Sequence, residues 1–380
     1  MNQARDQLSN IWHHFQSTLF PGLREEVGEL TAKQQQLIEV IEFAKVELFL
    51  PEFSGYIGRP TKSRSSMARA FMAKAVYNMP TTEMLLDRLQ TDIQLRRICG
   101  WEKMREVPSR ATFSRAFAEF SNEQLAERIH ASIIKSHLSE QLIGHISRDS
   151  TAIIAREKPI RKAPPKEAEP PKKRGRPKKG EARGKEPTRL ERQWAGMSLQ
   201  EMRSDLPTEC TVGTKRNSKG YKTSWTGYKL HIDSADGGIP VSCLLSSASL
   251  HDSQVAIPLA EITAERVTSC YDLMDSAYDA PIIREHSESL GHVPIIDQNP
   301  RTKEGKRAIK AEQKRQRRVG HKLAESIRYN ERSTVERVNG RLKDDFGARM
   351  LRVKGHAKVM THLMFGVIVL TVGQLMRTLE

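Results

Sequence analysis

A Pro-, Lys- and Arg-rich segment at residues 156–192 most constrains how this chain can fold. It has no hydrophobic periodicity, and a segment of this composition cannot bury enough apolar surface to offset the entropy lost on ordering. We therefore expect it to be disordered. It directly follows residues 142–154, whose β-branched residues predict a strand with Asp149 near its end. The basic segment thus interrupts the chain between its first strand and all later ones.

The positive charge of the chain is concentrated in two places. The formal net charge is +16. Residues 156–192 hold 15 Lys and Arg against 6 Asp and Glu, and residues 301–322 hold 10 against 2, which leaves the remainder at −1. Two basic arms on a neutral body predict nucleic acid as the partner. Anionic lipid is the competing partner, but neither segment has the apolar face of an interfacial helix.

The first basic segment contains the run KKRGRPKKG, which includes Arg174 and Arg176. This run resembles an AT-hook, whose extended Arg-Gly-Arg core fits the narrow minor groove of A·T tracts because glycine lets the backbone approach closely. A linker that binds phosphates without sequence preference is the alternative.

The chain before the first strand is predicted to be helical. Apolar residues recur at helical spacing between residues 37 and 44, and several further helices are expected from residue 64 to about residue 139. Breaks are expected at residues 79–80, 99–100 and 107–108. A helix from about Arg110 presents Arg110 and Arg115 outward, which would suit a helix-turn-helix reader of DNA. Plain helical packing explains this stretch equally well.

Strands and helices alternate after the basic segment. The sequence predicts a hairpin with strands at about residues 225–233 and 239–247, a helix after residues 251–253, a strand that ends near Asp275, and, after a short helix, a strand at residues 292–298. Together with the strand before the insertion, this makes five strands.

The apolar stretch at residues 359–376 is long enough to be considered as a membrane span. It contains four polar residues, Thr361, His362, Thr371 and Gln374. We therefore predict a buried C-terminal helix rather than a membrane segment.

Residues 329–347, YNERSTVERVNGRLKDDFG, form the sequence's most specific pattern. At about 100° per residue of helix, four functional side chains share an arc of about 60°: Tyr329, Arg332, Glu336 and Lys343. A separate apolar stripe beside it is formed by Leu323, Ile327, Val335, Val338 and Leu342. A charged stripe of this kind can also be a solvated helix face.

Three carboxylates occupy positions that phosphoryl-transfer chemistry could use. Asp149 and Asp275 lie at strand ends, and Glu336 lies on the late helix. A two-metal site needs hard oxygen ligands that converge from separate elements to hold two Mg²⁺ ions about 3.5–4 Å apart.

With these acids in this order of elements, the sequence resembles the DDE transposases of bacterial insertion sequences, in the insertion-sequence-four superfamily. The signature of that family is Tyr, two residues, Arg, three residues, Glu, six residues, Lys, and residues 329–343 match every spacing. The runs DST at Asp149 and DSAYD at Asp275 match the family's first and second acids, although Ala277 stands where Gly is more frequent. Residues 58–120 also resemble the helical region found in many of these transposases.

The resemblance implies an α/β fold, an RNase H-like mixed five-stranded sheet with flanking helices, preceded by an all-helical N-terminal domain. It implies that Asp149, Asp275 and Glu336 are catalytic and bind two Mg²⁺ ions, for which Mn²⁺ could substitute. Tyr329, Arg332 and Lys343 would contact the DNA strand end. Gly340 would let DNA approach the helix, or it is simply tolerated there.

The expected domain organisation and partners follow from the same observations. The predicted boundaries are a helical DNA-binding and dimerisation region at 1–140, the first strand of the catalytic domain at 141–155, a basic disordered insertion with the AT-hook-like motif at 156–210, the rest of the catalytic domain at 211–350 and a C-terminal helix at 351–380. We expect double-stranded DNA, both transposon ends and target, as the substrate of a homodimer, with no membrane and no small-molecule substrate.

The four cysteines form no CxxC pair, which argues against a zinc site and a disulfide scaffold. The first residues show no basic patch followed by an apolar core, so we expect a cytoplasmic, nucleoid-associated protein.

The sequence favours a DNA transposase that cuts at the terminal inverted repeats of its own element and joins the freed end to target DNA. A transposase-derived DNA-binding or architectural protein without catalysis is the alternative from another class. A nuclease of RNase H type without strand transfer is the third candidate.

Overall fold

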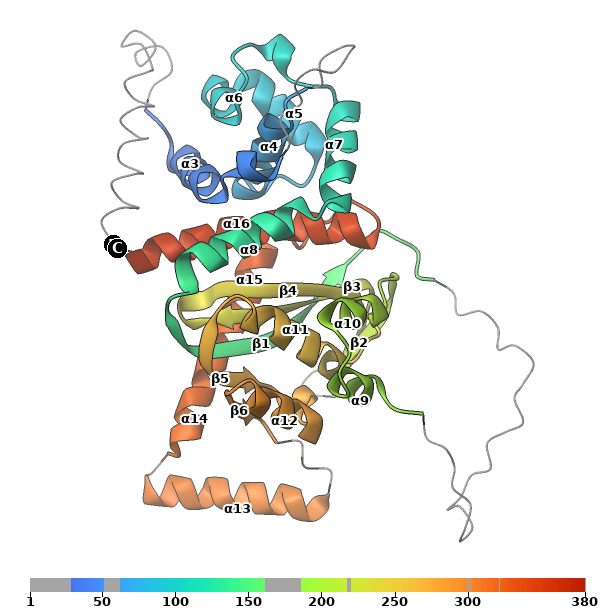
Figure 1. Ribbon diagram of the computed structural model, residues 1–380, viewed down its shortest axis with the longest axis vertical. Coiled ribbons are helices and arrows are strands. Elements are labelled where there is room, and N and C mark those ends of the chain that lie inside the picture. Colours follow the sequence, from blue (N-terminus) through green and yellow to red (C-terminus); the bar gives the residue numbers. More distant parts are fainter. Residues whose placement is uncertain are drawn as a thin grey trace, which may run out of the picture.

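The computed structural model describes residues 29–50, 62–160, 186–216, 220–298, 300, 302–320 and 322–379. The AT-hook-like motif with Arg174 and Arg176 lies outside these residues, as does most of the basic segment that is predicted to be disordered. The prediction of disorder is wrong at residues 189–205, which contain the helices α9 (Arg189–Trp194) and α10 (Leu199–Asp205). Figure 1 shows the described elements in three parts: a group of helices, a sheet beside it, and a helical extension beyond the sheet.

The N-terminal helices form where the sequence predicts them. They are α3 (Ala32–Ala44), η1 (Val46–Phe49), α4 (Arg64–Val76), α5 (Thr82–Thr91), α6 (Ile93–Cys99), η2 (Met104–Glu106), α7 (Arg110–Asn122) and α8 (Leu125–Leu138). Thr31 caps α3 in a capping box with Gln34, and α6 ends at Gly100, whose φ of 101° suits glycine. The three predicted breaks all fall between these helices.

A six-stranded mixed sheet follows. Its strands are β1 (Leu142–Ile154), β2 (Thr211–Arg216), β3 (Lys222–Ala235), β4 (Ile239–Ser247), β5 (Thr268–Met274) and β6 (Val293–Ile296). Strand β1 is central: β3 pairs antiparallel with one edge of it, and β5 pairs parallel with the other. Strand β6 extends the sheet beyond β5, and β4 pairs antiparallel with β3. The order β4-β3-β1-β5-β6 confirms the RNase H-like fold.

The sixth strand was not predicted. Strand β2 pairs antiparallel with the first half of β3, from Thr211 opposite Gly227 to Arg216 opposite Lys222. Its residues are mostly exposed, so it lacks the apolar alternation by which a strand is recognised. Pairing with β3, which begins three residues before the predicted strand start at residue 225, makes it a strand.

Helices cover both faces of the sheet. Four of them, α9 (Arg189–Trp194), α10 (Leu199–Asp205), α11 (Ala256–Ala264) and α12 (Pro281–Ser289), pack together, with α11 against β3 and β4 and α12 against β6. On the opposite face, α15 (Ser333–Asp344) packs against β1 and β3, and α16 (His356–Leu379) packs against β4.

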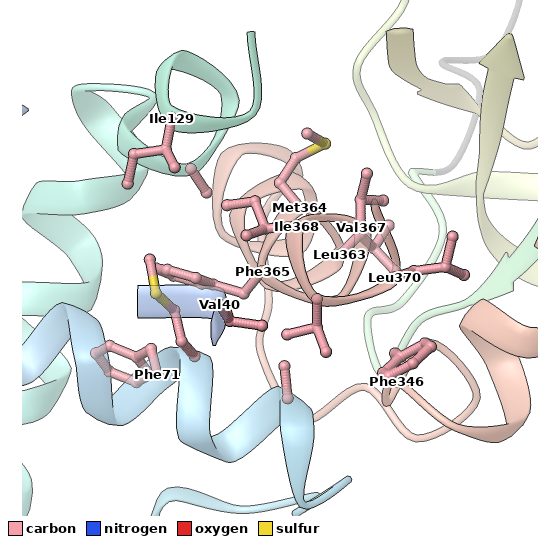
Figure 2. Packing of buried hydrophobic residues seen from close by; sticks show 14 of the residues in the cluster. Val40, Phe71, Ile129, Phe346, Leu363, Met364, Phe365, Val367, Ile368 and Leu370 are labelled. Atoms are coloured by element: carbon pink, nitrogen blue, oxygen red, sulfur yellow. The ribbon is translucent and has the colours of Figure 1, made fainter. Parts of the chain in front are cut away.

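Helix α16 joins the helical region to the sheet. Figure 1 shows it lying between the N-terminal helices and β4. Figure 2 views it end on, with Phe71 of α4 on one side and Phe346 on the other. Phe71 stacks on Phe365 with ring centroids 5.8 Å apart. By length and composition α16 could span a membrane. However, 78% of its most apolar 18-residue stretch is buried inside the protein, as the prediction of a buried helix requires.

The late helical region differs from the single helix that the sequence predicts. A 3₁₀ turn, η6 (Asn330–Arg332), separates α14 (Ala324–Tyr329) from α15. Helix α13 (Lys303–Val319), in the second basic segment, has no buried residue. The predicted apolar stripe is buried at Val335, Val338 and Leu342, but Leu323 is 43% exposed and Ile327 54% exposed. That part of the prediction is wrong because α14 extends past the sheet and has no core to pack against (Figure 1).

Candidate functional site

Strand β1 sends neighbouring side chains to opposite faces of the sheet. Arg148 points to the α11 side, where its Nε and Nη2 donate to the two carboxylate oxygens of Asp233 at 2.8 and 2.6 Å. Thr263 of α11 donates to the same carboxylate at 2.7 Å. Asp149 points to the other side, where Nδ2 of Asn339 on α15 donates to its Oδ2 at 3.1 Å. The buried Arg148–Asp233 pair thus fixes β1 at the residue next to Asp149.

Asp149 lies five positions before the end of β1, not near its end as predicted, because the strand continues to Ile154 in its pairing with β3. Strand β5 runs parallel to β1 with Met274 opposite Arg148. Asp275 follows Met274 directly, so the two acids lie at equivalent positions of adjacent strands. The Asp275 carboxylate accepts a hydrogen bond from the Ala277 backbone N–H at 2.9 Å, which orients it at the strand end.

Arg332 is the common neighbour of the predicted site residues. Its Nη2 donates to Oε1 of Glu336 at 2.6 Å, and its Nη1 lies 3.9 Å from Oδ1 of Asp149. Its guanidinium carbon lies 5.9 Å from the ring centroid of Tyr329. Burial lowers the pKa of Arg332, but Tyr329 and the carboxylates of Asp149, Glu336 and Asp275 outweigh it and raise the pKa above the usual value. The structure therefore groups Tyr329, Glu336, Asp149 and Asp275 around the guanidinium of Arg332.

The carboxyl group of Asp149 has a raised pKa. Burial raises its pKa to about 6, against the lowering effects of a hydrogen bond from the Ser150 backbone N–H and of the charge of Arg332. The nearby charge of Asp275 raises the pKa further. A half-buried acid whose pKa is raised next to another acid is a frequent feature of functional sites.

Lys343 completes the predicted signature at the last turn of α15. Burial lowers its pKa, as do the charges of Arg349 and Lys215, while Asp149 acts in the opposite direction. Lys215 lies on β2, and its positive charge lowers the pKa of Asp149. Two lysines from different elements therefore bring positive charge to the surroundings of Asp149.

Three neighbours of the site were not recognised in the sequence. Asn339 holds Asp149, Lys215 adds a cation, and Asp297 follows β6 and contributes to the charge around Tyr329. Asp297 had a usable signal, because it follows a strand parallel to β5 just as Asp275 follows β5 itself. Asn339 and Lys215 had none, since both act through contacts between distant parts of the chain.

Carboxylate oxygens are the ligands that Mg²⁺ prefers, so the donor atoms of the three acids suit that ion. Oδ1 of Asn339, beside Asp149, is buried without a hydrogen-bond partner and is a further oxygen donor in the same place. In the part of the chain that the structure describes, however, no group of three or more His, Cys, Asp or Glu side chains lies close enough to hold a metal ion. Glu336 is instead bound by Arg332, and the metal-binding role of the three acids stays a prediction.

The surface of α15 is open at Gly340. A Cβ atom built at this glycine meets no atom within 4 Å. Packing therefore does not require a glycine here, and the position leaves room for a molecule to approach the helix between Glu336 and Lys343.

The other predicted DNA contacts lie far from this group in the chain. Arg110 begins α7 and pairs with Glu83, and Arg115 lies one turn later; both are exposed. Their predicted role in DNA binding stays a prediction, as do the roles of Arg174 and Arg176, which lie outside the described residues.

Comparisons with known protein families give two matches. Residues 203–372 match the family described as Transposase DDE domain, and residues 25–119 match the family described as Transposase domain (DUF772). No curated protein and no solved structure matches the chain. The first match runs from α10 into α16 and includes Asp275 and the whole of α15. The second covers α3 to α7 almost completely. The two matches are with transposase families, and they support a transposase function for the chain.

Proposed function

We propose that this protein is a DNA transposase of the insertion-sequence-four superfamily. It binds the terminal inverted repeats of its own insertion sequence, cuts a strand there by metal-dependent hydrolysis, and joins the freed 3′-OH to target DNA. The observation that carries this proposal is the grouping of Asp149, Asp275, Glu336 and Tyr329 around Arg332. All of these residues except Asp149 lie in the stretch that matches the transposase DDE family.

Each side chain has a role that its surroundings support. Asp149, Asp275 and Glu336 would hold Mg²⁺, which would supply activation of the attacking oxygen and stabilisation of the leaving oxygen of a phosphodiester. Arg332 binds a phosphate of the strand end through its planar fork of donors, and Lys343 binds another as a point charge. Asn339 keeps the Asp149 carboxylate turned toward α15 through its 3.1 Å hydrogen bond.

DNA binding and site assembly are coupled through Arg332. Its guanidinium is bound to Glu336 at 2.6 Å before DNA arrives, and the Glu336 side chain is 58% exposed. A backbone phosphate of DNA carries one negative charge, as the carboxylate does, but it accepts two parallel hydrogen bonds from a guanidinium and lies in a dense row of like charges, so it competes for the same donors. Exchange of Arg332 from Glu336 to a phosphate would leave the Glu336 carboxylate unpaired and able to serve as a metal ligand.

The test is cleavage of a labelled inverted-repeat duplex in Mg²⁺, scored separately from binding in EDTA. Asp149→Ala, Asp275→Ala and Glu336→Ala should each abolish cleavage and leave binding nearly intact, because these acids hold metal rather than DNA. Arg332→Ala should weaken binding. Cleavage that survives in one of the acid variants would remove that residue from the site.

The alternatives separate in the same assay. A transposase-derived DNA-binding protein without catalysis would bind the end duplex but never cut it. A nuclease of RNase H type would cut it but would not join the freed end to a second duplex, so a strand-transfer assay with a labelled target distinguishes it from a transposase.

A further inference from the structure

A second basic surface lies away from the candidate site, where the N-terminal helices meet the chain that leads into α16. It is a cavity of about 640 Å³ lined by α4, α5, α7, residues 352–354 and the start of α16. None of Asp149, Asp275, Arg332, Glu336 and Lys343 lines it. We call it the basic cavity, after the cations in its lining: Lys74, Arg110, Arg156, Arg352, Lys354 and Lys358.

The cations of the basic cavity are poorly balanced by acids. Among the described residues that line it, Glu83 is the one acid, and it is paired with Arg110. Arg156, Arg352, Lys354 and Lys358 are exposed, and none of them forms an ion pair with a described carboxylate. Several cations with little acidic charge among them make the lining electropositive, which favours an external anion.

Lys74 is the strongest single indication that the basic cavity binds an anion. Its residue is 8% exposed, and it has no hydrogen bond or ion pair to any side chain in the described part of the protein. Burial lowers its pKa to about 8, so most of it stays charged at neutral pH. No carboxylate is paired with Lys74 among the described residues, and a largely desolvated cation without a counter-charge is costly to keep. It lies in the wall of a cavity that an anion can enter.

Three helix N-termini also reach the basic cavity. Thr81 and Thr82 begin α5, Arg110 begins α7, and Lys354 and Lys358 flank the first residue of α16. The N-terminus of a helix carries unpaired backbone N–H groups and a partial positive charge, which together favour phosphate. The three helices are 10, 13 and 24 residues long.

We propose that the basic cavity binds backbone phosphates of double-stranded DNA at a distance from the strand that is cut. This rests on the proposed function, and it adds a second point of attachment for the substrate duplex. Arg156 lies seven residues beyond Asp149, just past the end of β1. At about 3.3 Å per strand residue, the cavity lining begins no more than about 23 Å from Asp149. That span corresponds to about seven base pairs of duplex at 3.4 Å each.

The first test compares salt dependence of binding. Arg352→Gln/Lys358→Gln should flatten the slope of log affinity against log salt by about two units and lower affinity for a 30-base-pair end duplex about ten- to a hundredfold at 0.1 M salt. Arg105→Gln/Lys135→Gln is the matched control, because both residues are exposed and line neither the cavity nor the candidate site. The control should bind like the parent protein.

A second comparison uses duplex length. The parent protein should bind a duplex that extends at least ten base pairs past the cut more tightly than one that ends after four, and the Arg352→Gln/Lys358→Gln variant should lose most of this difference. If the parent protein binds end duplexes but the variant keeps the parental slope and the parental length effect, the inference is wrong and the proposed function stands. If the parent protein binds no DNA, the proposed function itself fails.

Lys74 gives an independent readout. Lys74→Met removes the buried charge while keeping the length of the side chain, so the variant should melt at a higher temperature than the parent protein and yet bind the long duplex more weakly. Higher stability with unchanged DNA binding would mean that Lys74 holds no phosphate. Binding of inorganic phosphate by the cavity with no effect of any of these variants on DNA binding would also overturn the inference.

Discussion

Replacing Arg148 by methionine should destabilise the protein by about 3–5 kcal/mol, because it leaves the carboxylate of Asp233 buried without its counter-charge. Arg148 is 3% exposed and Asp233 is fully buried. Burial lowers the pKa of Arg148, but the Asp233 carboxylate and its two hydrogen bonds outweigh this and raise the pKa above the usual value for arginine. Arg148→Met alone therefore bears the full cost of a buried Asp233 carboxylate that has lost its partner.

The double variant Arg148→Met/Asp233→Leu should recover most of that loss, since two apolar side chains of similar volume replace the ion pair and its cost of desolvation. Without the Asp233 carboxylate, the Thr263 hydroxyl would donate instead to the Leu259 carbonyl oxygen, 3.0 Å away, so this buried hydroxyl is not left unpaired. Arg315→Met is the control. Arg315 is 75% exposed in its pair with Glu312, and an exposed pair of this kind is worth less than about 1 kcal/mol.

The assay is urea unfolding followed by tryptophan fluorescence and circular dichroism, with free energies compared at equal slope. A loss of less than about 1 kcal/mol in Arg148→Met would refute the reasoning, because the carboxylate would then be hydrated in the folded protein. A double variant as unstable as the single one would also refute it, since the buried pair would then be worth more than apolar packing.

Four further predictions concern other sites. Gly340→Ala should raise stability by about 0.5–1 kcal/mol, since the added methyl group meets no neighbour, yet weaken end-duplex binding if DNA lies on the helix; equal binding would exclude that contact. Burial lowers the pKa of His130 to about 3, so the unfolded chain takes up the proton first and stability falls below about pH 6.5, by about 2 kcal/mol at pH 5. Urea midpoints at pH 7 and 5 test this, with His130→Gln expected to show a smaller difference. Replacing Arg174 and Arg176 with Ala should weaken binding to A·T-rich duplex more than to G·C-rich duplex, and equal losses would leave only a nonspecific tether. Arg332→Lys should lose part of the cleavage with little change in salt dependence, whereas full activity would exclude a two-point phosphate contact.

Local signals in the sequence were sufficient for most of the fold. Proline and glycine at residues 80, 100 and 108 marked real helix boundaries, because neither residue fits a helix interior. A run rich in β-branched residues marked β1. Strand β2 was missed because its polar residues are held by pairing with β3, and pairing between distant segments leaves no local periodicity.

The candidate site was predictable where spacing along one helix decides it. Tyr329, Arg332 and Glu336 are grouped as expected, although a 3₁₀ turn replaces the regular helix at residues 330–332. The pairing of Arg332 with Glu336 was not foreseen, because a stripe of charges does not show which of them bind one another without substrate. Asn339 was overlooked for a similar reason, since its partner Asp149 is 190 residues away in the chain.

The position of α16 has a consequence for how the protein is made. Every element that the helix packs against precedes it in the chain, and one of its buried contacts, between Thr371 and His130, spans 241 residues. During synthesis, the apolar faces of α3, α4, α8 and β4 therefore stay uncovered until α16 has been translated. Contacts of such long sequence separation form slowly, and the uncovered surfaces are prone to aggregate meanwhile. We expect the nascent chain to depend on chaperones until α16 has left the ribosome.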